Sequence, residues 1–180
     1  MEELERHAFG GPLLSGPRRR HTLKVLGRAR EFWPHDPLLQ RASLLHDVGY
    51  AEHLVLTGMH AVDGGRWCAE AGEHWEVSSL VAWHTGAWYE ADERGLLAEL
   101  EAFERPSEER LDALTLCDLT TSPTGKEVGV PGRIAEILRR YPDEHPVHRA
   151  VTRSQGELVL ACRRAIKRLG LSEGWGLTAL

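Results

Sequence analysis

Histidine and aspartate are the residues of this chain whose number and placement could do chemistry. The 180 residues include ten histidines but only three cysteines. Histidine is the commonest metal ligand in proteins and titrates near neutral pH. The cysteines are isolated and form no C-x-x-C pair, which excludes a disulfide framework and a thiolate zinc site. A metal site in this chain would therefore use imidazole and carboxylate ligands.

Three predicted helices carry an ionisable residue on the face that should be buried. His46, His84 and Asp118 each come four residues after an apolar residue of that face, a spacing that places the two on one side of a helix. His21 lies four residues before Val25 in the same way. A buried carboxylate without a partner costs several kcal/mol or shifts its pKa. A cation shared by these side chains would explain their common placement.

Each of these residues also has a simpler interpretation. A single histidine on an apolar face is most often a hydrogen-bonded core residue. A single aspartate near a helix end is often capped or paired with a cation, and an adjacent His-Asp pair is common by chance. The ordered set as a whole favours metal binding. It consists of His21, His46, Asp47, His60, His84 and Asp118.

The order of these residues resembles that of the HD-domain superfamily of metal-dependent phosphohydrolases. Members of that family have a His, then a His-Asp doublet on a following helix, and then a distant Asp. The segment LLHDVGY around the doublet of this chain is similar to the family's LLHDIG. Two further segments, HAVDGGRWC and LVAWHTGA, look like the second-metal ligands of two-metal members. The resemblance covers about residues 18 to 141.

The resemblance implies a role for each ligand. One or two divalent transition metal ions would bind, and Asp47 would bridge them, which makes it the implied catalytic residue. Imidazole and carboxylate ligands favour Fe, Mn, Ni, Co or Zn. Two such ions about 3.5–4 Å apart activate a water and neutralise the attacked phosphoryl group, so no protein nucleophile is needed. The first ion would be held by His21, His46, Asp47 and Asp118, and the second by Asp47, His60 and His84.

The chain departs from the family pattern at two positions. Two-metal members often have a Lys three residues after the doublet, where this chain has Tyr50, and many have a His-His pair where it has Trp83 and His84. The missing lysine, and the absence of a Gly-Tyr-Pro element, argue against the cyclic-dinucleotide phosphodiesterase branch. The segment HTGA at His84 is similar to the HTTG of the branch that hydrolyses diadenosine tetraphosphate.

Two basic residues are candidates for contacts with a substrate phosphate. Arg20 belongs to an arginine cluster that directly precedes His21, and Lys126 lies in the loop after Asp118. A solvated surface position is the simpler interpretation of each.

Helical periodicity extends over almost the whole chain and predicts a single compact all-α domain. Residues 1–17, which contain several Gly and Pro, are expected to form an N-terminal arm. Residues 18–180 would form the HD domain, including its C-terminal helix. A short strand over Glu127–Val130 is the one predicted exception. The predicted helices span about residues 18–33, 37–49, 60–71, 75–85, 95–104, 107–119, 134–141 and 147–169.

Composition limits the partners of the chain. The formal net charge of -5 argues against a dedicated nucleic-acid surface. No apolar stretch approaches the ~18 residues needed to span a bilayer, and the acidic start of the chain is unlike a secretory signal. We therefore expect a cytoplasmic protein without a membrane partner. The sequence leaves its oligomeric state open.

These observations predict a metal-dependent phosphohydrolase that uses metal-activated water. Its substrate would be a small phosphorylated molecule, with a nucleotide as the expected class, and the bond broken a phosphoester or a phosphoanhydride. Two alternatives stay open. One is an HD-fold di-iron oxygenase, and the other is a non-catalytic, metal-stabilised nucleotide sensor.

Overall fold

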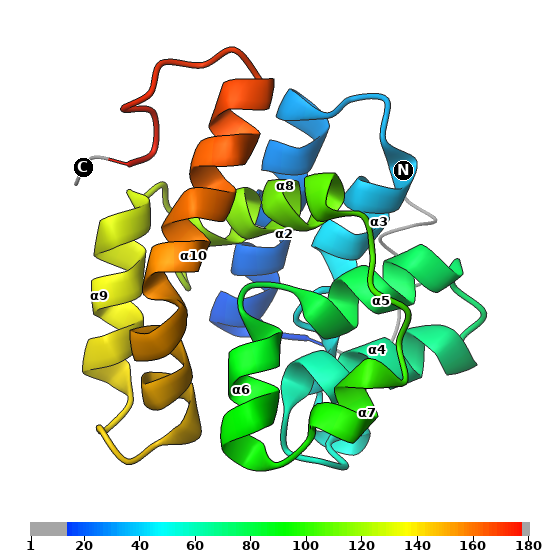
Figure 1. Cartoon of the computed structure of the whole chain (residues 1–180). Coiled ribbons are helices and arrows are strands. Elements are labelled where there is room, and N and C mark those ends of the chain that lie inside the picture. The colour runs from blue at the N-terminus through cyan, green and yellow to red at the C-terminus, as the bar shows by residue number, and fades with distance from the viewer. Residues whose placement is uncertain (1–13, 178–180) are drawn as a thin grey trace.

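The computed structural model describes residues 14–177, in which nine α-helices form nearly all of the regular structure (Figure 1). Two 3-10 turns, η1 (Val48–Tyr50) and η2 (Glu52–Leu54), follow the second of these helices. The predicted all-α class is confirmed. The helices are α2 (Gly16–Phe32), α3 (Pro37–Leu45), α4 (His60–Glu70), α5 (Trp75–Trp83), α6 (Ala87–Arg94), α7 (Leu97–Glu101), α8 (Glu108–Leu119), α9 (Val130–Arg140) and α10 (Pro146–Arg168).

The structure departs from the predicted elements at two places. The strand predicted over Glu127–Val130 is wrong: in the described part of the chain, Glu127 forms only an isolated bridge with Thr121, and Val130 already begins α9. Helix α6 has no counterpart in the prediction. Its buried residues are two alanines, which give a weak apolar periodicity.

Most of the N-terminal arm predicted for residues 1–17 lies outside the described residues. Helix α2 begins at Gly16, two residues before the predicted boundary. The division into an arm and a domain of residues 18–180 stays a prediction.

Local capping explains where two of the helices begin. The Asp36 carboxylate accepts a hydrogen bond from the Leu39 amide at 3.0 Å, and Pro37 occupies the first position of α3. The Ser107 hydroxyl accepts from the Arg110 amide at 3.2 Å at the start of α8. Both arrangements satisfy amides that have no partner within the helix. They fix the ends of two helices that carry predicted ligands.

Helix α8 lies at the centre of the fold. In Figure 1 it crosses the molecule, with α4 and α5 packed together on one side and α9 and α10 on the other. One apolar cluster joins α8 to α2, α3 and α5, and another joins it to α9 and α10. Eight of its twelve residues are buried. A polar side chain on α8 is therefore held between the two halves of the molecule.

A close approach of two segments brings the His-Asp doublet beside α4. Gly49, in η1, packs against the first turns of α4. A Cβ at this position would lie 2.0 Å from the carbonyl oxygen of His60 and 2.6 Å from the amide nitrogen of Gly64. Only glycine permits this approach. The glycine that follows the doublet thus sets the distance between Asp47 and His60.

Candidate metal centre

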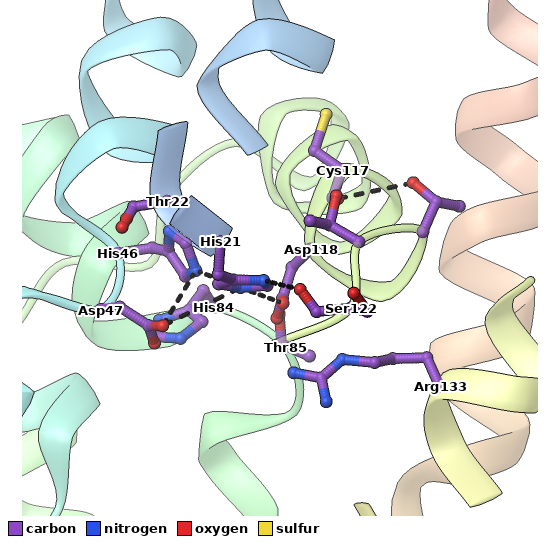
Figure 2. A network of polar contacts seen from close by, with 12 residues as sticks. His21, Thr22, His46, Asp47, His84, Thr85, Cys117, Asp118, Ser122 and Arg133 are labelled. Carbon is purple, nitrogen blue, oxygen red and sulfur yellow. Dashed lines mark hydrogen bonds and ion pairs between the residues drawn. The ribbon is translucent and has the colours of Figure 1, made fainter. Parts of the chain in front are cut away.

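The six predicted ligands come together at one place, although they are spread over about a hundred residues of sequence. They lie on α2, at the ends of α3 and α5, at the start of α4 and on α8. Five are almost completely buried, and His60 is partly buried. Figure 2 shows most of them converging between α2 and α8. The buried members are His21, His46, Asp47, His84 and Asp118.

Their ligand atoms form two groups joined by Asp47. Within each group the atoms lie within 4.8 Å of one another. The Oδ2 atom of Asp47 lies 3.7 Å from Nε2 of His46 and 3.9 Å from Nε2 of His21, whereas its Oδ1 atom lies 3.7 Å from Nε2 of His60. One carboxylate thus faces both groups. The groups are His21, His46 and Asp118, and Asp47, His60 and His84.

Backbone carbonyl groups orient three of the four imidazoles. His21, His46 and His84 each place Nδ1 within hydrogen-bond distance of a carbonyl oxygen. A carbonyl oxygen can only accept, so each Nδ1 carries the hydrogen and each Nε2 keeps its lone pair. This bracing is typical of metal-binding histidines. The acceptors are the carbonyl oxygens of Ser122, Ser43 and Val81, at 3.0, 2.9 and 2.6 Å respectively.

The orientation leaves two lone pairs facing each other. Nε2 of His21 and Nε2 of His46 lie 3.3 Å apart. When both rings are neutral, with the hydrogen on Nδ1, neither Nε2 can donate to the other; a proton on Nε2 of His21 would be donated to Asp118, at 3.1 Å, instead. A shared cation would bind both lone pairs. This arrangement, more than the residue types alone, fits a metal ion.

The carboxylate of Asp118 is held from two sides. Its Oδ1 atom lies 3.1 Å from Nε2 of His21, and its Oδ2 atom accepts a hydrogen bond from the Thr85 hydroxyl at 2.7 Å. Burial raises the pKa of Asp118, but the hydrogen bond and charge of His21 outweigh it and hold the pKa well below the usual value. Thr85 has φ 44°, in the left-handed region that non-glycine residues rarely adopt. This strained backbone aims the hydroxyl at Asp118.

Burial also sets the ionisation of the other ligands. It lowers the pKa of His46 to about 4 and that of His60 to about 3, so both are neutral at pH 7. Burial raises the pKa of Asp47, but the positive charges that His46 carries at low pH and Arg18 at any pH outweigh it and lower the pKa below its usual range. Burial lowers the pKa of His21, whereas the hydrogen bond that its Nε2 donates to Asp118 in the protonated form raises it, and the net shift in the metal-free protein is upward. A neutral imidazole beside an ionised carboxylate is the state that binds metal.

Two residues at the site were not among the predicted contacts. Arg18 Nη1 donates to Oδ2 of Asp47 at 2.7 Å, and its guanidinium lies 3.6 Å from the centroid of the Tyr50 ring. Tyr50, at the position of the family's lysine, stacks on His60 with ring centroids 4.1 Å apart. Helical spacing carries a signal for Arg18, because it lies three residues before His21 and therefore on the same face of α2.

The two predicted phosphate contacts lie elsewhere. The side chains of Arg20 and Lys126 are exposed. Two cavities border the cluster, and neither residue lines either of them. The structure does not bring them together with the six ligands.

A small cavity opens onto the ligand cluster. Its volume is about 90 Å³, and α9 supplies two arginines to its wall. A larger hollow of about 510 Å³ lies between α6, α8 and α10, but none of the six ligands lines it. Besides ligands, the wall of the small cavity includes Arg18, Tyr50, Thr85, Glu90, Arg133, Arg140 and Tyr141.

The HD domain family matches residues 18–121, more than half of the chain, and the chain belongs to this family. The matched segment contains all six ligands. Members of the family are mostly metal-dependent hydrolases, and the His/Asp cluster described above could hold a divalent metal. No curated protein and no solved structure matches the chain. None of the helices in the described part of the chain is both long and apolar enough to cross a membrane.

Proposed function

We propose that this protein is a phosphohydrolase that uses divalent transition metal ions to hydrolyse a phosphoester or phosphoanhydride bond. Its substrate is a small phosphorylated molecule, with a nucleotide as the expected class. One observation carries the proposal: three imidazoles are braced through Nδ1 so that their Nε2 atoms face the Asp47 and Asp118 carboxylates. Membership of the HD domain family supports it.

The donor set fits one or two ions of Fe, Mn, Ni, Co or Zn, because it combines imidazole nitrogen with carboxylate oxygen. When bound, such ions lower the pKa of a water and offset the negative charge of a phosphoryl group. His21, His46, Asp47 and Asp118 would hold one ion, and Asp47, His60 and His84 a second.

The surrounding side chains have tasks that follow from their contacts. Thr85 orients Asp118, and Tyr50 fixes the ring of His60 by stacking on it. Arg18 pairs with Asp47 and lines the cavity, where its guanidinium can pair with a phosphate oxygen. We propose that Arg20 and Lys126, both exposed, attract an anionic substrate from a distance rather than contact it.

The decisive experiment combines elemental analysis with a panel of substrates. Purified protein is analysed for metal, then loaded with Mn, Fe, Ni or Co and assayed for phosphate release from mono-, di- and triphosphates and phosphodiesters. We expect bound metal and release of phosphate, both lost in Asp47→Asn. A protein that holds no metal would overturn the proposal.

The same experiment separates the two alternatives. A di-iron oxygenase with this ligand set would contain iron, consume O₂ and release no phosphate. A nucleotide sensor would bind a nucleotide tightly and turn over none of the panel with any metal. We also propose a cytoplasmic location, which is supported by three buried cysteines that are all free thiols, as expected of a reducing compartment.

A further inference from the structure

A second cavity beside the metal centre is lined by arginine. Its volume is about 240 Å³, roughly eight times the share of one water molecule in the liquid. Its charged residues are Arg18, Arg133 and Arg140, with His21 on the side of the metal centre, and no carboxylate of the described residues lines it. The same three arginines also line the small cavity at the ligands. They therefore border both spaces.

Arg133 is the unusual member of this group. Its relative exposure is 8%, and Figure 2 shows its guanidinium reaching from α9 toward Thr85 and Asp118. Its Nε atom is buried without a hydrogen-bond partner. A buried donor without a partner is unfavourable. An acceptor that arrives with a ligand would satisfy it.

The two arginines of α9 that line the pocket share their ion-pair partner. Glu136 accepts from Nη1 of Arg133 and, at 3.0 Å, from Nε of Arg140. A single carboxylate is thus shared by two guanidinium groups. The acid paired with Arg18 is Asp47, which also faces three of the histidines. The lining of the second cavity therefore carries an excess of positive charge, and Asp118, which is close enough for the charge of Arg133 to lower its pKa, lines only the small cavity at the ligands.

Arg28 shows that burial alone does not make such a site. Its Nε atom is also buried without a partner. Its Nη2 atom, however, donates to the Thr120 carbonyl oxygen at 3.2 Å and pairs with Glu127 at 3.3 Å. Arg28 lines neither of the cavities at the metal centre. Its contacts are those of a residue that ties α2 to the loop after α8.

We propose that Arg133 and Arg140, together with Arg18, bind a second phosphoryl group of the substrate. Guanidinium groups bind phosphate oxygens with paired, charge-assisted hydrogen bonds. The group bound here stays in place while water attacks the phosphorus of the neighbouring phosphoryl group at the metal centre; the P–O bond of the bridging oxygen breaks, and that oxygen leaves with the group bound here. The substrate is then a di- or oligophosphate rather than a phosphomonoester. This inference rests on the proposed function, which supplies the hydrolysed group.

Binding of inorganic pyrophosphate and of inorganic phosphate tests the subsite directly. Calorimetry is carried out on the metal-loaded protein, with excess metal in the buffer. We expect the wild-type protein to bind pyrophosphate at least about 10-fold more tightly than phosphate. Arg133→Ala should weaken pyrophosphate binding about 10- to 100-fold, the range for loss of a hydrogen bond to a charged group, and phosphate binding less than about 3-fold.

Three further variants keep this test independent of folding. Arg140→Ala, at a less buried position, should weaken pyrophosphate binding about 3- to 10-fold. Arg133→Lys retains the charge but loses the planar fork, and should recover only part of the affinity. Arg139→Ala removes the same charge from the same helix at an exposed position that lines neither cavity, and should behave like the wild type.

The outcomes distinguish this inference from the proposed function. Equal binding of pyrophosphate and phosphate by the wild type, or equal losses for both in the Arg133 and Arg140 variants, would overturn the subsite even if phosphate is released from substrates. If pyrophosphate is preferred and that preference is lost in these variants, the subsite stands even where the substrate panel shows no turnover. In that case only the hydrolase proposal fails.

Discussion

Two regions meet at this site and differ in how their charged groups are paired within the protein. The segment that matches the HD domain family, residues 18–121, supplies imidazoles and carboxylates, of which His46, His84 and Asp118 are held by carbonyl or hydroxyl groups. Helix α9 lies beyond the match and supplies two arginines that share one carboxylate. In the first region, Nδ1 of His46, Nδ1 of His84 and the Asp118 carboxylate each have a partner within the protein, and the atoms that face one another are left for a cation. The second has one carboxylate for two guanidinium groups.

This difference indicates how the work of the site is divided. Braced ligands keep one geometry whatever the substrate, which suits chemistry common to a family. Under-compensated arginines gain most when a phosphate binds, which suits selection among substrates. A change in the first region should therefore affect every substrate alike. A change on α9 should affect substrates according to their number of phosphates.

The largest expected effect is that of Asp47→Ala. This variant removes the carboxylate that both groups of ligands share. We expect bound metal to be lost and turnover of every substrate to fall by at least on the order of 10³-fold, since metal catalysis is worth several kcal/mol. Helicity measured by circular dichroism should be largely retained.

A matched control for Asp47→Ala is Asp143→Ala, in the loop before α10, where the carboxylate is almost fully exposed. It should retain metal and activity. A metal-free and fully active Asp47→Ala variant would contradict the assignment of the metal chemistry to the first region.

The second effect is that of Thr85→Val, which keeps the shape of the side chain but removes the hydroxyl that donates to Asp118. Loss of a group that orients a metal ligand typically costs about 10- to 100-fold in metal affinity or activity. We expect that loss to be equal for mono- and diphosphates. Titration of metal into the chelator-treated protein measures it.

The matched variant here is Thr85→Ser, which retains the hydroxyl and should remain close to the wild type. A loss in Thr85→Val that is confined to diphosphates would show that the two regions do not have separate roles. An equal loss in Thr85→Ser would assign the effect to the strained backbone at this position instead of the hydrogen bond.

The sequence predicts the first region far better than the second. His46 and Asp118 lie on helical faces whose phase is set by neighbouring apolar residues, so local periodicity brings them inside. Helical spacing also predicts which arginines of α2 face the site. Arg18 lies three residues before His21 and shares its face, whereas Arg20 is adjacent to His21 and faces solvent.

No comparable local signal marks the arginine pocket. Arg133 reaches the site because α9 packs against α8 and α10, and its distance in space from Arg18 depends on that tertiary packing. Helix α6 is missed for a related reason, since its only buried residues are two alanines. Long-range packing and small residues leave little periodicity to detect.

The third prediction concerns pH, which should affect only the first region, since arginine does not titrate in the accessible range. Burial lowers the pKa of His46 to about 4 and that of His60 to about 3, against about 6.5 in an unfolded chain. Below pH 6.5 the unfolded chain binds protons that the folded protein does not. The metal-free protein should therefore lose stability as the pH falls from about 6.5 through about 4.

His21 opposes this trend, because its raised pKa adds stability at low pH that is lost as the pH rises through that pKa. The lowered pKa values of His46 and His60 have a larger combined effect on stability than the raised pKa of His21. Urea midpoints of chelator-treated protein between pH 4 and 8 measure the slope, and His60→Gln should reduce it. A midpoint that stays constant or rises toward pH 4 would show that these histidines are not buried in their neutral form.

The smallest expected effects are those of Arg20→Ala and Lys126→Ala. Both side chains are exposed and line neither cavity, so their attraction for an anionic substrate acts through water and is screened by salt. We expect KM to rise by no more than about 2-fold at low salt, with kcat unchanged and no difference at high salt. A fall of kcat in either variant would mean that the side chain touches the substrate. The boundary of the substrate site would then extend beyond the arginines of α9 to the exposed face of α2 or the loop after α8.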